Sequence, residues 1–268
     1  MTSETPSRRQ PFQESSPSAH GLTWADYLEG FHERRPGITE DVLARSTAHG
    51  LTPYGWIADP LPETGVVLDL ACGSAPLARL FERGRWVGTD RSPAELDRAA
   101  RGGAGPLVRA DATALPFATG AFDGVVCSMA IMLLQPLDAV LAEIRRVVVN
   151  GGISVFMLPG SRPLRVVDLL RYLRLMIAVG RTHLAYPNDR PLIRSDGLLR
   201  RAGFEVVADE RLRFEYAFED EGSTRRFVDS LYLPAVPERR VADASRAAAG
   251  WVGQRIGIPL RRMIVRAT

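Results

Sequence analysis

The sequence contains no lysine. All 34 basic residues are arginine, and they stand against 31 acidic residues, for a formal net charge of +3. The absence of lysine excludes Schiff-base chemistry on a lysine and a Walker-type phosphate lysine. Two cysteines in 268 residues are too few for a disulfide scaffold or a cysteine-rich zinc module. We therefore expect a reducing, cytoplasmic location and no metal site.

Long apolar runs are also absent. No window approaches the ~18 to 20 uninterrupted apolar residues of a membrane helix, and no basic, apolar and small-residue signal peptide opens the chain. With 46% hydrophobic and 24% charged residues, the chain can bury one large core. We expect one main domain and no membrane partner.

Arginine is concentrated near the C-terminus. Residues 237–268 contain seven arginines against Glu238 and Asp243. This excess fits either a nucleic-acid footprint or a solvated helix face. Because Trp251 is the one aromatic residue in this segment, the pattern favours the solvated face over nucleic-acid binding.

Three regions follow one another along the chain. Residues 1–20 are rich in Ser, Pro, Gln and Arg without periodicity, which predicts a disordered tail. Residues 21–62 predict an N-terminal helical cap, because apolar residues recur at helical spacing from Trp24 onward. Residues 63–268 form the main domain, with an insertion at about 161–195.

The main domain alternates short apolar runs with helical segments, which predicts parallel strands joined by right-handed crossovers. We expect an α/β, doubly wound, mostly parallel sheet of seven strands. The predicted strands are 66–70, 85–89, 106–109, 122–128, 152–158, 204–218 and 258–266, and the predicted helices are 76–83, 93–101, 136–148, 166–179 and 198–202.

The turn after the first predicted strand is nearly free of side chains. Asp69 lies at the end of the strand, and Ala71, Gly73 and Ala75 follow at every second position. Ser74 is expected to cap the next helix. A ligand can approach this backbone closely and meet the unpaired N–H groups of a helix N-terminus.

Two further acids follow at equal spacing. Asp90 comes 21 residues after Asp69 and closes the second strand, and Asp111 comes another 21 residues later, at the tip of the third. An acid at the neighbouring strand tip is where a ribose presents its hydroxyls, and a third acid can accept from an adenine amine. Three acids at successive strand tips favour a nucleoside site over three unrelated turn formers.

These residues resemble the class I, Rossmann-like S-adenosylmethionine-dependent methyltransferases of the small-molecule type. The family's first motif, an acid followed by glycine-x-glycine-x-glycine, is similar to the turn after Asp69, with alanine at two of the three glycines. Phe122-Asp123 and the arginine-valine segment at 145–152 resemble two later motifs. The likeness covers roughly residues 64–160.

The resemblance implies S-adenosyl-L-methionine as cofactor. It places the adenine-side acid at Asp111, the ribose acid at Asp90 and the methionine contact at Gly73. The expected cofactor-binding residues are Asp69, Ala71, Gly73, Asp90, Arg91, Asp111, Ala112, Cys127 and Tyr54.

The acceptor pocket must come from segments outside the sheet. Met129 and Met132 follow the fourth strand in an apolar stretch, which indicates a hydrophobic acceptor, although core packing is the alternative. His32 and Tyr186 are further acceptor contacts. His183, in the insertion that commonly roofs this site in the resembling enzymes, is expected as general base, with a surface position as the alternative.

We expect methyl transfer to a nucleophilic atom of a small, partly apolar acceptor, such as a specialised metabolite. An RNA or protein methyltransferase, and a methyltransferase-fold protein with a non-methylating role such as a cyclase, are the alternatives. A homodimer is left open. A nicotinamide-binding domain is disfavoured because its G-x-G-x-x-G pattern retains only Gly73 here.

Overall fold

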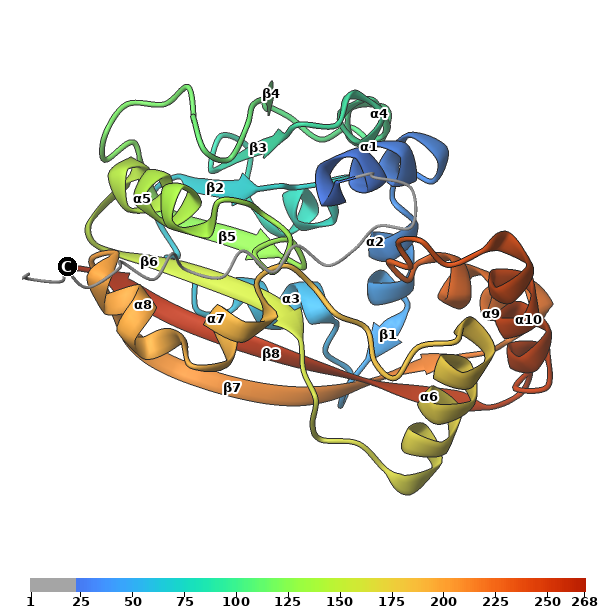
Figure 1. Ribbon diagram of the computed structural model, residues 1–268. Helices are drawn as coiled ribbons and strands as arrows, with labels where there is room; N and C mark the ends of the chain where they lie inside the picture. Colours follow the sequence, from blue (N-terminus) through green and yellow to red (C-terminus); the bar gives the residue numbers. More distant parts are fainter. Residues whose placement is uncertain (1–22) are drawn as a thin grey trace, which may run out of the picture.

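A computed structural model describes residues 23–268, which contain an eight-stranded sheet in the order β1-β7-β8-β6-β5-β2-β3-β4 (Figure 1). Neighbouring strands from β6 to β4 are parallel, whereas β8, β7 and β1 are added antiparallel. The predicted α/β fold with a mostly parallel core is confirmed. The predicted tail, residues 1–20, lies outside the described residues.

The strands are β1 (Ser46–Thr47), β2 (Val67–Leu70), β3 (Trp86–Asp90), β4 (Leu107–Arg109), β5 (Phe122–Ser128), β6 (Val148–Pro159), β7 (Phe204–Ala217) and β8 (Arg255–Ala267). The helices are α1 (Trp24–Arg34), α2 (Ile38–Ala44), α3 (Pro53–Ala58), the 3-10 helix η1 (Pro76–Leu80), α4 (Pro93–Arg101), α5 (Leu137–Val147), α6 (Val166–Val179), α7 (Asp189–Ile193), α8 (Ser195–Arg201), α9 (Glu221–Asp229) and α10 (Glu238–Ala249).

Three parts of the structure differ from the predicted elements. The eighth strand, β1, belongs to the helical cap and pairs with β7. The helix predicted after the glycine turn is the short η1, and Ala75, not Ser74, occupies its N-cap position without a side-chain hydrogen bond. The helices α9 and α10, between β7 and β8, were not predicted, because small and charged residues dominate both segments.

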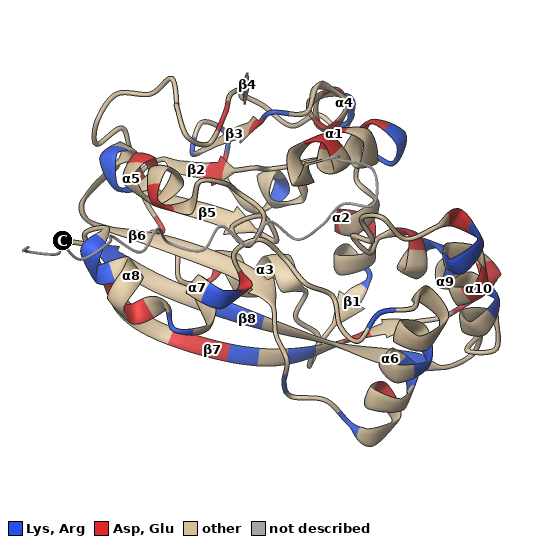
Figure 2. Cartoon of the chain, viewed as in Figure 1, with Lys and Arg blue, Asp and Glu red and all other residues tan. Residues whose placement is uncertain are grey.

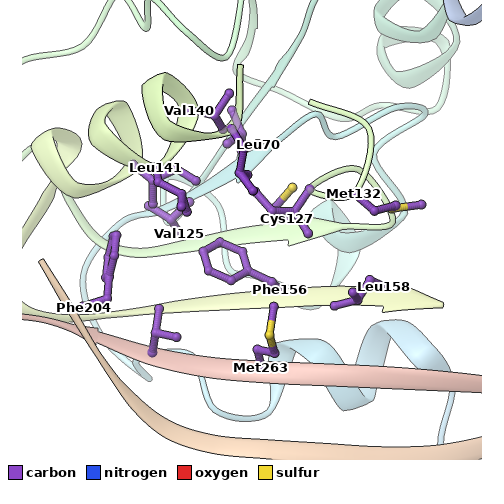
Figure 3. Close-up of a cluster of buried hydrophobic side chains, with 14 of the residues drawn as sticks. Leu70, Val125, Cys127, Met132, Val140, Leu141, Phe156, Leu158, Phe204 and Met263 are labelled. Carbon is purple, nitrogen blue, oxygen red and sulfur yellow. The ribbon is translucent and has the colours of Figure 1, made fainter. Parts of the chain in front are cut away.

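Alternating residues of the strands supply two apolar cores. Leu68 and Leu70 of β2 face the same core as Val125 of β5, and helix α5 covers it (Figure 3). Val67 and Val126 point to the opposite face, where α3 packs. This period of two along buried strands fixes which side chains face each layer.

A third core lies at the far end of the long β7–β8 ribbon. Helices α6, α9 and α10 pack there on apolar residues of the ribbon, including Tyr216 and Ile256. Figure 1 shows these helices beyond the end of the parallel strands. The insertion between β6 and β7 and the one between β7 and β8 therefore meet in one layer.

The arginine-rich C-terminal segment divides between two environments. Arg239, Arg240 and Arg246 are exposed on α10, as a solvated helix face requires. Arg261 and Arg262 are buried in β8 and bind Asp209 and Glu210 of β7, and Figure 2 shows acidic and basic residues side by side along these strands. The two buried arginines correct the expectation of one solvated face, because acids on the neighbouring strand hold them inside.

Two further searches covered the described part of the chain. No helix in residues 23–268 is long and apolar enough to cross a membrane. In the same residues, no group of three or more His, Cys, Asp or Glu side chains is arranged to hold a metal ion.

Candidate functional site

A pocket opens at the carboxyl ends of β2, β3, β4 and β5, between the sheet and the helical cap. Figure 1 shows α1 and α2 at the end toward which the arrows of β2, β3 and β5 point. This is the edge at which ligands bind in open α/β sheets. The predicted site residues that line it are His32, Tyr54, Asp69, Ala71, Gly73, Asp90, Arg91, Asp111, Ala112 and Met129.

The turn after β2 forms the floor of the pocket. Ala71, Gly73 and Ala75 have φ angles of 55°, 54° and 57°, so all three are left-handed. The two alanines therefore keep the backbone that glycine adopts freely, at a cost of about 1 kcal/mol each. The motif departs from glycine in sequence but retains its turn.

Asp69 is the buried acid of the site. Its Oδ2 accepts a hydrogen bond from the Trp86 indole at 3.3 Å, while its Oδ1 is buried and has no partner. Burial raises the pKa of Asp69 well above its ordinary value. A buried polar atom without a partner in a pocket wall is suited to receive a donor from a ligand.

Asp90 connects the tip of β3 to the turn. Its Oδ2 accepts from the backbone N–H of Gly73 and its Oδ1 from that of Ser92, both at 2.9 Å. Burial raises the pKa of Asp90, and these two hydrogen bonds oppose that rise. A carboxylate has about four lone-pair sites, so Asp90 retains capacity for two ligand hydroxyls.

Asp111 stands at the exposed rim. It accepts from the hydroxyl and the backbone N–H of Thr113, at 2.7 and 2.8 Å, and these bonds lower its pKa. Asp111 is therefore ionised at neutral pH and oriented by its own turn. The three acids predicted from spacing line one pocket.

The helical cap supplies the opposite wall. The Tyr54 hydroxyl and the Glu40 Oε2 atom are buried there without hydrogen-bond partners. Burial, followed by the nearby charge of Glu95, raises the pKa of Glu40 to about 7. The sequence gives no signal for Glu40, because an acid in the first turn of a short helix is typical of any solvated helix.

His32 lies on the same wall with an acidic partner. Its Nδ1 donates to Glu95 Oε1 at 2.7 Å, and its Nε2 lies 3.5 Å from the Tyr232 hydroxyl. Burial lowers the pKa of His32, but Glu95, Glu40 and Asp90 outweigh burial and raise it. Glu95 and Tyr232 were not predicted as site residues, since they lie 63 and 200 residues from His32 in sequence.

Four predicted site residues lie outside the pocket wall. Cys127 and Met132 are fully buried in the apolar core, and Figure 3 shows them among other core side chains. Tyr186 packs behind the wall against Trp24 and Tyr232. His183 is exposed and contacts Thr182, so the structure does not support it as general base.

The strand order, the left-handed turn and the acids at consecutive strand tips correspond to a known family. The profile of the family described as "Methyltransferase domain" matches residues 68–156. The chain carries a class I S-adenosylmethionine-dependent methyltransferase domain. This family implies S-adenosyl-L-methionine as methyl donor.

Two curated relatives of this methyltransferase domain are similar over about 100 residues. A malonyl-[acyl-carrier protein] O-methyltransferase of Legionella pneumophila is 39% identical over 98 residues, which cover 34% of either chain. A 2-phytyl-1,4-naphtoquinone methyltransferase of Thermosynechococcus vestitus is 35% identical over 101 residues, which cover 34% of this chain and 45% of that protein. The match thus spans less than half of each relative.

Solved structures extend the likeness of the methyltransferase domain to most of the chain. The crystal structure of a candidate methyltransferase from Bacillus halodurans aligns with a TM-score of 0.53 and 17% identity, covering 80% of this chain and 98% of the other. At this identity the alignment shows the fold alone.

Proposed function

We propose that this protein transfers the methyl group of S-adenosyl-L-methionine to a nucleophilic atom of a small, partly apolar acceptor. The observation that carries the proposal is the convergence of Asp69, Asp90 and Asp111 on one pocket beside the left-handed turn at Gly73. The curated relatives named above also transfer methyl groups, and they support the reaction class.

The residues of the pocket fit the cofactor. Asp111 would face the adenine amine and Asp90 the ribose hydroxyls, while the amino-acid tail would lie beside the turn at Gly73, which also lines the pocket. The unpartnered atoms of Asp69, Tyr54 and Glu40 provide acceptors and a donor for polar groups. When bound, the cofactor supplies a methyl group already activated toward nucleophiles, so the protein's part is placement.

The rest of the pocket wall indicates which kind of acceptor molecule would bind there. Trp24, Leu28, Met129, Leu133 and Leu134 line this part of the pocket, so its surface is largely apolar. The cap closes it on one side, which favours a small molecule over a folded macromolecule. One curated relative is named for a phytyl-bearing naphthoquinone, which also has a large apolar part.

His32 is the proton acceptor that the geometry supports in place of His183. Glu95 fixes its Nδ1 proton, which leaves Nε2 toward the pocket beside Tyr232. An imidazole held in this way can take the proton of an acceptor hydroxyl or amine as it attacks the methyl carbon. Its role is confined to acceptors that lose a proton in that step.

The direct test uses S-adenosylmethionine with an isotope-labelled methyl group. The full-length protein is incubated with this donor and an organic extract of the source cells, and mass spectrometry follows the label and S-adenosylhomocysteine. We expect a labelled small molecule and an equal amount of S-adenosylhomocysteine. Label in RNA or protein would favour the macromolecular alternative, and cofactor binding without product in any fraction would favour a non-methylating role.

Asp90 gives a mutational test of the cofactor site. We expect Asp90→Ala to weaken S-adenosylhomocysteine binding by about 10- to 150-fold, which corresponds to the ~1.5–3 kcal/mol of hydrogen bonds to a charged group. Calorimetric titration measures the loss. Asp97→Ala, an exposed acid on α4 outside the pocket, is the control and should bind as the unmodified protein does. Unchanged affinity of Asp90→Ala would contradict the assignment.

A further inference from the structure

Glu40 lies directly over the glycine turn. It belongs to α2, and its Oε1 accepts from the backbone N–H of Ser74 at 3.4 Å. A Cβ atom placed on Gly73 would lie only 1.8 Å from the same oxygen. The carboxyl group therefore occupies the space that the missing side chain of Gly73 leaves open.

The surroundings of Glu40 are acidic. Its second oxygen, Oε2, is buried without a hydrogen-bond partner and belongs to a residue of the pocket wall. Besides burial, the charge of Glu95 contributes to the raised pKa of Glu40, and the charge of Glu40 contributes to the raised pKa of Asp69. His32 can carry positive charge there, but its Nδ1 is already bound to Glu95. A buried acid in such a place is suited to a cationic ligand group.

The order of the strands indicates which part of the cofactor reaches Glu40. In the sheet β4, β3 and β2 are consecutive, with Asp111, Asp90 and Asp69 at or beside their tips. With adenine at Asp111 and ribose at Asp90, the amino-acid tail continues over β2 and the Gly73 turn. That tail ends in an ammonium and a carboxylate.

We propose that Glu40 binds the α-ammonium group of the cofactor through its free Oε2 atom. The inference rests on the proposed function and adds a ligand from the helical cap to the acids of the sheet. Binding would draw α2 and the turn together. The helical cap would then bind the charged end of the cofactor, and the acids of the sheet would bind its nucleoside.

Three ligands distinguish binding of the ammonium group by Glu40 from binding of the sulfonium or the nucleoside. S-adenosylhomocysteine has the ammonium but no sulfonium, S-adenosylmethionine has both, and 5′-methylthioadenosine has neither the ammonium nor the carboxylate. We expect Glu40→Gln to weaken both amino-acid-bearing ligands by about 10-fold or more, as for a lost charge-assisted hydrogen bond. Binding of 5′-methylthioadenosine should change less than about twofold.

Asp41→Asn is the matched control. Asp41 follows Glu40 on α2 but points away from the pocket and pairs with Arg98 at 2.8 Å. This variant removes the same charge from the same helix, and we expect all three affinities to stay as in the unmodified protein. Calorimetric titration of each full-length variant, with circular dichroism as a check of folding, provides the comparison.

Each contrary result has a distinct meaning. If the unmodified protein binds none of the ligands, the proposed function fails. If it binds them and Glu40→Gln binds S-adenosylhomocysteine equally well, the role of Glu40 fails and the proposed function stands. An equal loss for 5′-methylthioadenosine, or a loss for S-adenosylmethionine alone, would assign Glu40 to the nucleoside or the sulfonium and also overturn the inference.

The pH dependence of binding provides a second readout. Burial and Glu95 raise the pKa of Glu40 to about 7, and an ammonium favours its ionised form. The affinity for S-adenosylhomocysteine should therefore rise by up to about tenfold between about pH 6 and pH 8 and level off above. Glu40→Gln lacks this ionisable group, so its affinity for S-adenosylhomocysteine should rise less over the same pH range. The titratable groups that face Glu40 are His32, Tyr54, Asp69, Cys72, Glu95 and Tyr232.

Discussion

Gly73→Leu is expected to abolish measurable cofactor binding while the domain stays folded. The new side chain would start 1.8 Å from Glu40 Oε1 and extend into the floor of the pocket. Glu40 would have to move, and both it and Gly73 line the pocket in which the amino-acid tail is proposed to lie. We expect the affinity for S-adenosylhomocysteine to fall by more than about 100-fold, since the ligand would have to give up its contacts with the turn.

The control variant must place a leucine at another glycine with a left-handed backbone, but outside the pocket. Gly84 has a φ angle of 87°, is exposed, and has no atom within 4 Å of a Cβ placed on it. Gly84→Leu should therefore lose about 1 kcal/mol of stability, as Gly73→Leu does from its left-handed φ, but should bind the cofactor normally. Equal affinities in the two variants would show that the cofactor does not pass over Gly73.

The acids of the site were predictable because each depends on a local rule. A strand of three to five residues followed by a turn puts an acid at or near its end at the sheet edge, and right-handed crossovers bring successive edges together. Asp69, Asp90 and Asp111 needed nothing else to be placed in one pocket. The alanines at 71 and 75 were predictable as a departure from the family motif, although only the structure shows their left-handed backbone.

The cap side of the site was not predictable, because it depends on contacts between distant segments. Glu95 meets His32 only when α1 packs on α4, and Tyr232 joins them from the segment after α9. His183 had the right residue type in a segment expected to form the roof. In the structure His183 is instead exposed to solvent. The sequence around it does not distinguish an exposed position from one in the roof of the pocket.

The buried residues of β5 were predictable in part. Strand alternation places Cys127 on the same face as Val125, in the apolar core that α5 covers, so it lies outside the pocket wall. The positions of Arg261 and Arg262 follow a different rule. Their burial depends on the register between β7 and β8, which brings Asp209 and Glu210 beside them and which the sequence pattern does not fix.

Arg213→Met is expected to cost about 3–5 kcal/mol of unfolding free energy, because it would leave a buried carboxylate without its cation. Asp168 of α6 is fully buried and accepts two hydrogen bonds from the Arg213 guanidinium, at 2.7 and 3.0 Å. It also accepts from the backbone N–H groups of Arg165 and Gly257. The Asp168–Arg213 pair thus holds α6 against the β7–β8 ribbon. Its loss should destabilise the packing of α6, α9 and α10 on this ribbon. Urea unfolding followed by circular dichroism measures the change.

Two further variants show whether the unpaired charge is the cause. Arg211→Met removes an exposed arginine two residues away and should cost less than about 1 kcal/mol, as for a surface ion pair. Combining Arg213→Met with Asp168→Asn removes the buried charge and keeps a side-chain oxygen for one of the two backbone donors, which bind different oxygens of Asp168. The double variant should therefore recover part of the stability that Arg213→Met loses. A double variant as unstable as the single one would show that lost packing of the guanidinium, and not the stranded carboxylate, governs the stability of this layer.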